Sequence, residues 1–157
     1  MIKQDILNTL HQMLPALSNL KDNYYIIGGS ALILQGLPLK RTHDIDLLCT
    51  TRDLAYLKDK WTTYYISSMP SPIEERFQST FAGFKFPLME VELQANLTVL
   101  HKGKWMDVTV EETTSVSVDG VEIKVPTLID MIRILTLFGR DKDIRRIGEI
   151  KDYMSLS

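Results

Sequence analysis

Cysteine is almost absent from the sequence, because Cys49 is the single cysteine among 157 residues. One cysteine cannot form an internal disulfide framework, and it suits a reducing compartment. No apolar run approaches the ~20 residues that a bilayer-spanning helix needs, and the amino terminus has no signal-peptide pattern. The sequence therefore predicts a cytoplasmic protein without a membrane partner.

Positive charge is not in excess either. The sequence has 18 Lys and Arg against 20 Asp and Glu, which gives a formal net charge of -2. This balance excludes a broad basic surface for duplex DNA, and it favours a small or locally bound phosphorylated substrate. The length fits one globular domain, so we expect residues 1–157 to form a single domain.

Several familiar catalytic and phosphate-binding motifs are missing. The sequence Gly28-Gly29-Ser30 does not continue into Gly-x-Gly-x-x-Gly, and no Gly-Lys-Ser/Thr of a P-loop is present. Cysteine and histidine residues do not have zinc-site spacing, and no Ser-His-Asp or Cys-His arrangement can be recognised. These absences argue against a dinucleotide-binding fold, a P-loop NTPase, a zinc enzyme and a hydrolase with a catalytic triad.

The pattern of apolar and turn-forming residues predicts alternating helices and strands. We expect helices over residues 2–20 (kinked or divided at Pro15), 31–35, 53–61, from the cap Thr127 to Phe138, and 141–154. Strands are expected over 24–27, 42–50, 62–67 and 89–93, with a further strand or extended stretch over 105–110 and a hairpin around Asp119-Gly120. Ser30 is expected to cap the helix that follows it. This order predicts an α/β protein of the α+β type, with a small mixed sheet flanked by helices.

Two carboxylates in the second expected strand carry the strongest chemical signal. Asp44 and Asp46 alternate along a strand, so their side chains point to the same face. Two anions held so close repel each other unless a cation lies between them. Glu90 and Glu92 alternate in the same way on a later strand, and either could supply a third carboxylate. Three such groups can hold one or two Mg²⁺ ions through oxygen ligands.

The diglycine turn before this strand predicts a phosphate site. Gly28, Gly29 and Ser30 open a short expected helix, where free backbone amides favour phosphate oxygens. Arg41 and Lys142 could bring positive charge to a triphosphate. Each has a plain alternative: Arg41 as a surface residue, and Lys142 as part of a solvated helix start.

The ordered set Gly28-Gly29-Ser30, Asp44-Ile45-Asp46 and a later acidic strand resembles the nucleotidyltransferase-fold superfamily, whose members are similar to polymerase beta. The segments Val125–Leu128 and Gly139–Asp143 resemble its small bacterial and archaeal members, which include lincosamide-type and abortive-infection toxin nucleotidyltransferases. The resemblance implies that Gly28, Gly29 and Ser30 bind phosphate. It also implies that Asp44 and Asp46 bind metal, with Glu92 preferred over Glu90 as the third carboxylate.

The resemblance further implies a reaction, the Mg²⁺-dependent transfer of a nucleoside monophosphate from an NTP such as ATP to a hydroxyl acceptor. The acceptor is a small molecule, a protein side chain or an RNA end, and residues 69–79 with the C-terminal helices would recognise it. A homodimer is one way to complete the acceptor site. The alternatives are a catalytically inactive nucleotide- or partner-binding module of the same fold, and a toxin–antitoxin component.

Overall fold

The computed structural model describes residues 2–155, which fold into five α-helices, one 3₁₀ helix and eight strands. In chain order these are α1 (Ile2–Leu17), β1 (Tyr25–Ile27), α2 (Gly28–Leu34), β2 (Asp44–Cys49), α3 (Thr51–Lys60), η1 (Thr62–Tyr64), β3 (Tyr65–Ser67), β4 (Phe77–Lys85), β5 (Glu90–His101), β6 (Lys104–Asp107), β7 (Thr113–Val118), β8 (Val121–Pro126), α4 (Leu128–Phe138) and α5 (Asp141–Ser155). The expected α+β class is confirmed. No helix of residues 2–155 is long and apolar enough to cross a membrane.

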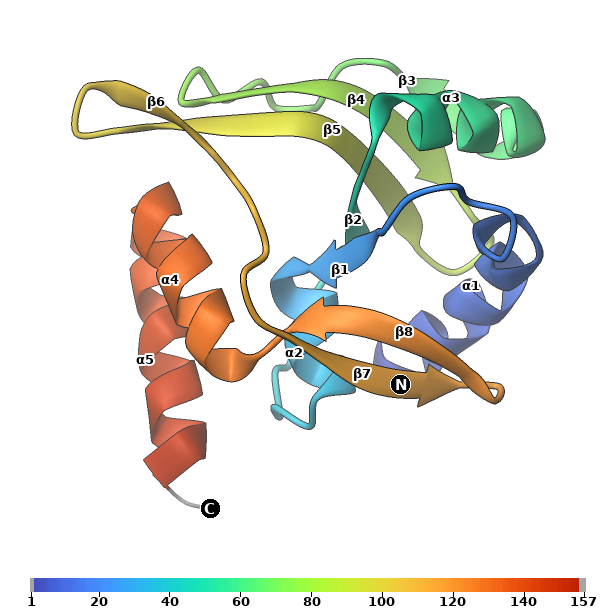
Figure 1. Cartoon of the computed structure of the whole chain (residues 1–157). Coiled ribbons are helices and arrows are strands. Elements are labelled where there is room, and N and C mark those ends of the chain that lie inside the picture. The colour runs from blue at the N-terminus through green and yellow to red at the C-terminus, as the bar shows by residue number, and fades with distance from the viewer. Residues whose placement is uncertain (1, 156–157) are drawn as a thin grey trace.

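The main sheet is mixed, as expected. Its strand order is β1-β2-β5-β4-β3, and β6 pairs with the far end of β5. The pair β2–β5 is parallel, whereas the other pairs of this sheet are antiparallel. The hairpin β7–β8 forms a separate two-stranded sheet below the main one (Figure 1). The parallel pair matters most for function, because β2 and β5 carry the acidic residues.

Two apolar clusters pack on opposite faces of the main sheet. One joins α1 and α3 to alternate strand residues such as Ile45 and Leu47. The other joins α4 and α5 to residues such as Ile27 and Leu48. Neighbouring residues of one strand belong to different clusters because successive side chains point to opposite faces. Both faces of the sheet are therefore covered, and the polar side chains on it lie inside a packed framework.

The strand β4 was not predicted, and several predicted boundaries were wrong. No strand was predicted between residues 67 and 89, but β4 begins at Phe77 and pairs with β5 along most of its length. The first helix ends at Leu17 instead of residue 20, and it runs through Pro15, which lies in its last turn. The expected strand over 62–67 begins as the 3₁₀ helix η1, and the strand expected over 105–110 ends at Asp107. The strand β4 has no regular apolar alternation, because small and polar residues fill part of it, so the sequence pattern did not indicate a strand.

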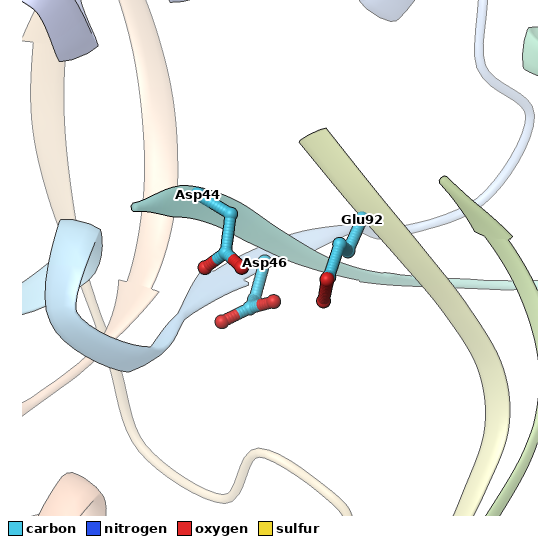
Figure 2. Close-up of side chains that lie close together, drawn as sticks. All are labelled: Asp44, Asp46 and Glu92. Atoms are coloured by element: carbon cyan, nitrogen blue, oxygen red, sulfur yellow. The ribbon is translucent and has the colours of Figure 1, made fainter. Parts of the chain in front are cut away.

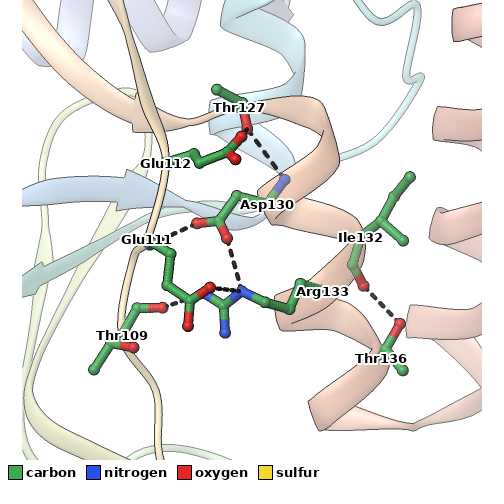
Figure 3. A network of polar contacts seen from close by, with 8 residues as sticks. All are labelled: Thr109, Glu111, Glu112, Thr127, Asp130, Ile132, Arg133 and Thr136. Atoms are coloured by element: carbon green, nitrogen blue, oxygen red, sulfur yellow. Dashed lines mark hydrogen bonds and ion pairs between the residues drawn. The ribbon is translucent and has the colours of Figure 1, made fainter.

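The C-terminal helices are fixed by caps and by a buried ion pair. Thr127 accepts a hydrogen bond from the amide of Asp130, and Gly139 ends α4 in the left-handed conformation, as expected. The buried carboxylate of Asp130 accepts from Arg133 Nε at 2.7 Å and from the amide of Glu111 at 2.9 Å (Figure 3). This network ties α4 to the segment between β6 and β7. It thereby sets the position of α5, which packs along α4 (Figure 1).

Candidate functional site

Three carboxylates meet on one face of the parallel strand pair. Asp44 and Asp46 project from β2, and Glu92 projects from β5 directly opposite Asp46 in the register. Each offers an oxygen atom, and these oxygens all lie within 4.8 Å of one another (Figure 2). All three side chains are half-buried. The structure thus brings together the two aspartates and one of the two candidate glutamates.

The three carboxylates disfavour one another's ionisation. Burial raises the pKa of Asp46 well above its usual value, and the charges of Asp44 and Glu92 raise it further. Burial and the charge of Asp44 raise the pKa of Glu92 to about 7. Burial also raises the pKa of Asp44, although a hydrogen bond with Glu92 acts in the opposite direction. Such a cluster is unfavourable when ionised without a cation, and hard oxygen donors are the ligands that Mg²⁺ prefers.

The geometry separates Glu92 from Glu90. Glu90 pairs with Asp44 in the register, but its side chain is exposed and lies outside the three-carboxylate cluster. Its charge still raises the pKa of Asp44. Glu90 therefore acts on the cluster from its edge, whereas Glu92 lies within the cluster, and its role as the third metal ligand stays a prediction.

Gly28 lies directly against the cluster. Its φ is +74°, and a Cβ atom built on it would lie 2.8 Å from Oδ2 of Asp46. Both the left-handed backbone and the close approach require glycine at this position. The diglycine turn and the carboxylates, which sequence analysis assigned to phosphate and to metal, are therefore adjacent.

Ser30 does not cap α2 as expected. The helix begins at Gly28, its N-cap position is Ile27, and no side chain makes a capping hydrogen bond there. Ser30 is instead fully buried, and its hydroxyl donates to the carbonyl oxygen of Asp44 at 2.8 Å. The serine side chain thus fixes the start of β2, and the role of Ser30 in phosphate binding stays a prediction.

Of the two cations predicted from sequence, Lys142 approaches the carboxylates. Its charge lowers the pKa of both Asp44 and Asp46, against the effect of burial. Arg41 is exposed and makes no hydrogen bond or ion pair within residues 2–155. It lies three residues before Asp44, and its role in phosphate binding stays a prediction.

Sequence reasoning missed Arg146. A Cβ atom built on Gly29 would lie 2.9 Å from an Nη atom of Arg146 and 2.9 Å from Oγ1 of Thr42, so the guanidinium packs against the diglycine turn. A usable signal was present in the sequence. Arg146 follows Lys142 by four residues, which places both on one side of a helix.

Comparison with known proteins gives matches by structure only. No family model and no curated protein matches the sequence. TM1012 from Thermotoga maritima, a presumed nucleotidyltransferase, is 20% identical with a TM-score of 0.75, and the match covers 100% of this chain and 97% of that one. The lincosamide antibiotic adenylyltransferase LnuA, solved with lincomycin bound, is 13% identical with a TM-score of 0.60, over 90% of this chain and 94% of that one. ANT(2'')-Ia, solved in complex with adenylyl-2''-tobramycin, is 10% identical with a TM-score of 0.58, over 94% of this chain and 88% of that one.

Proposed function

We propose that this chain, which has the fold of the nucleotidyltransferase superfamily, transfers a nucleoside monophosphate from an NTP to a hydroxyl acceptor. The observation that carries the proposal is the meeting of Asp44, Asp46 and Glu92 beside Gly28. An anionic cluster next to a glycine turn is suited to phosphoryl transfer, which depends on positioning and charge neutralisation more than on covalent chemistry.

The donor set supports a divalent metal as cofactor. Asp44, Asp46 and Glu92 would hold it, because three hard oxygen donors converge there and repel one another when ionised. One or two Mg²⁺ ions bound at such a site would neutralise the charge of the triphosphate and of the leaving pyrophosphate.

In the proposed reaction the acceptor oxygen attacks the α-phosphorus of the NTP. A bond forms between this oxygen and the α-phosphorus, and the bond from the α-phosphorus to the bridging oxygen of the β-phosphate breaks, which releases pyrophosphate. The acceptor proton passes to a carboxylate oxygen of Glu92, which lies on β5 opposite Asp46. We expect the backbone of Gly28 and Gly29, which lies beside the carboxylates, to contact the phosphates.

We propose ATP as donor and a small molecule as acceptor. The support comes from the structural neighbours, since one is an antibiotic adenylyltransferase bound to lincomycin and another is bound to adenylyl-2''-tobramycin. The net charge of -2 also fits a small acceptor better than a long nucleic acid.

The proposal is tested by calorimetric titration of ATP, GTP, CTP and UTP with and without Mg²⁺. We expect Mg²⁺-dependent binding of one triphosphate in the wild type, loss of that binding in Asp46→Asn, and its retention in the matched control Glu90→Gln. Transfer of an α-³²P label from the bound nucleotide to a metabolite extract then separates an enzyme from a binding module. Absence of binding to all four triphosphates would overturn the proposal.

A further inference from the structure

A cavity opens one step along the sheet from the three carboxylates. Its volume is about 430 Å³, which suits a small molecule. Leu48 and Gln94 both line it and are partners in the register of β2 and β5. Each lies two residues beyond one of the clustered carboxylates, Asp46 and Glu92. Since side chains alternate along a strand, Gln94 points to the same face as Glu92, about 7 Å further along β5. The cavity therefore adjoins the candidate site.

A bulge in β5 shapes the part of the cavity that lies beyond the end of β2. Between two regular pairs with β4, Asn96 and Leu97 lie opposite the single residue 79. Asn96 has a φ of 54°, a conformation that asparagine tolerates better than most residues. Bulges bend a strand and redirect side chains, and they are frequent next to active sites. Here the bulge places both Asn96 and Leu97 in the lining of the cavity.

Another wall of the cavity is an irregular segment that hydrogen bonds hold in place. Asp107, Val108 and Thr109 belong to the lining. The amide of Val108 donates to the carbonyl oxygen of Leu97 at 2.9 Å. Arg133 of α4 donates to the carbonyl oxygen of Thr109 at 2.6 Å (Figure 3). A ligand would therefore meet a wall that is already ordered, which lowers the entropy cost of binding.

The lining offers hydrogen bonds but no positive charge. Within residues 2–155, the side chains of Gln94, Asn96 and Asp107 make no hydrogen bond or ion pair. An amide both donates and accepts, as the hydroxyl groups of a sugar or polyol do. No lysine or arginine is among the described residues that line the cavity, and Asp107 adds a negative charge. An anionic acceptor, such as an RNA end or a sugar phosphate, would be repelled.

We propose that this cavity is the acceptor subsite, and that Gln94 and Asn96 select a small polyhydroxylated acceptor without negative charge. The inference rests on the proposed function, and it names the class of acceptor. One hydroxyl of the acceptor would reach the carboxylates while neighbouring hydroxyls bind the two amides. Its oxygen then forms the bond to the α-phosphorus, pyrophosphate leaves, and the proton passes to Glu92.

The test offers two groups of acceptors to the protein. A metabolite extract is divided on an anion-exchange resin into an anionic fraction, which is retained, and a non-anionic fraction, which is not. Each fraction is incubated with Mg²⁺ and the α-³²P-labelled triphosphate that the protein binds, and transfer of the label is measured. We expect transfer to the non-anionic fraction only, because the cavity provides no cation for an anionic acceptor.

Variants of the lining test the two amides. Gln94→Leu and Asn96→Gly should each lower kcat/KM for the non-anionic fraction by about three- to tenfold, mainly through the apparent KM measured over a dilution series. Glycine accepts the φ of 54° at position 96, so Asn96→Gly keeps the bulge. The Kd of the triphosphate and the melting temperature should stay at their wild-type values. Gln78→Leu, at an exposed position of β4 outside the cavity, is the matched control.

Other results overturn the inference in distinguishable ways. Transfer to the anionic fraction instead would keep the proposed function and reject the acceptor class. Wild-type kcat/KM in both Gln94→Leu and Asn96→Gly would remove the cavity from acceptor binding. Weaker triphosphate binding in both variants would assign the amides to the donor. A wild type that binds no triphosphate, or that binds one and labels neither fraction, would overturn the proposed function together with this inference.

Discussion

Gly28 and the carboxylate of Asp46 are so close that a methyl group on Gly28 would lie 2.8 Å from Oδ2 of Asp46. Gly28 directly follows the last residue of β1, and Asp46 lies in the middle of β2, opposite Ile27 in the register. The backbone turn and the carboxylate therefore fix each other's positions. A change at Gly28 should act on the site directly as well as on stability.

Replacement of Gly28 by alanine is expected to disrupt the site. Alanine disfavours a φ of +74°, which costs about 1–2 kcal/mol, and the added methyl group would also displace Asp46. Gly103→Ala is the matched control, since Gly103 has a φ of +78° and no atom within 4 Å of its added Cβ. Urea denaturation should show a larger loss for Gly28→Ala than for Gly103→Ala, and calorimetry should show loss of Mg²⁺-ATP binding in Gly28→Ala alone. Equal behaviour of the two variants would contradict the steric argument.

Asp46→Asn should stabilise the metal-free protein near pH 8 and abolish its response to Mg²⁺. The substitution removes one of three mutually repelling charges, and it also removes a metal ligand. Thermal melts with and without Mg²⁺ measure both effects, and we expect the wild type, but not Asp46→Asn, to gain melting temperature on adding the ion. Glu90→Gln serves as control and should keep the Mg²⁺ response. An Asp46→Asn protein that unfolds would show that this aspartate has a structural role instead.

The stability of the metal-free protein should fall as the pH rises. Burial and the charge of Asp44 raise the pKa of Glu92 from 4.5 to about 7 on folding, so the folded state binds the proton more tightly than the unfolded state does. The stability that this tighter proton binding contributes is complete below pH 4.5 and is lost as the pH rises through about 7. Urea denaturation at a series of pH values should show this decline, and Glu92→Gln should flatten it. A wild-type stability that rises between pH 5 and pH 8 would contradict the assignment.

Asp53 is expected to be a structural carboxylate. It is 1% exposed, and its two oxygens accept the backbone amides of Lys21 and Asp22, each at 2.9 Å. Asp53→Ala removes both hydrogen bonds between α3 and the segment before β1, and it should cost about 2–4 kcal/mol of unfolding free energy. Asp59→Ala, at an exposed position of the same helix, should change stability by less than about 0.5 kcal/mol. Similar losses in both variants, measured by urea denaturation, would contradict the role of Asp53.

The sequence by itself determined those features that depend on near neighbours in the chain. The alternation of Asp44 and Asp46 requires a common face in any strand, so their pairing could be predicted before the fold was known. Thr127 and Gly139 set the ends of α4 through local cap chemistry, and Asp119-Gly120 set a hairpin turn. These signals are local because a strand period, a cap or a tight turn involves only a few consecutive residues.

Only the tertiary structure decided which distant groups complete the site. Glu90 and Glu92 share one face of β5 and each lies opposite an aspartate, so only their burial shows that Glu92 joins the cluster. The structure likewise shows that Ser30, an expected helix cap, instead donates a hydrogen bond to the carbonyl oxygen of Asp44. It also shows that Arg146 packs against Gly29. The partners in these contacts are separated by 14 to more than 100 residues. Their meeting depends on strand register and on how α4 and α5 pack, which no short stretch of the sequence specifies.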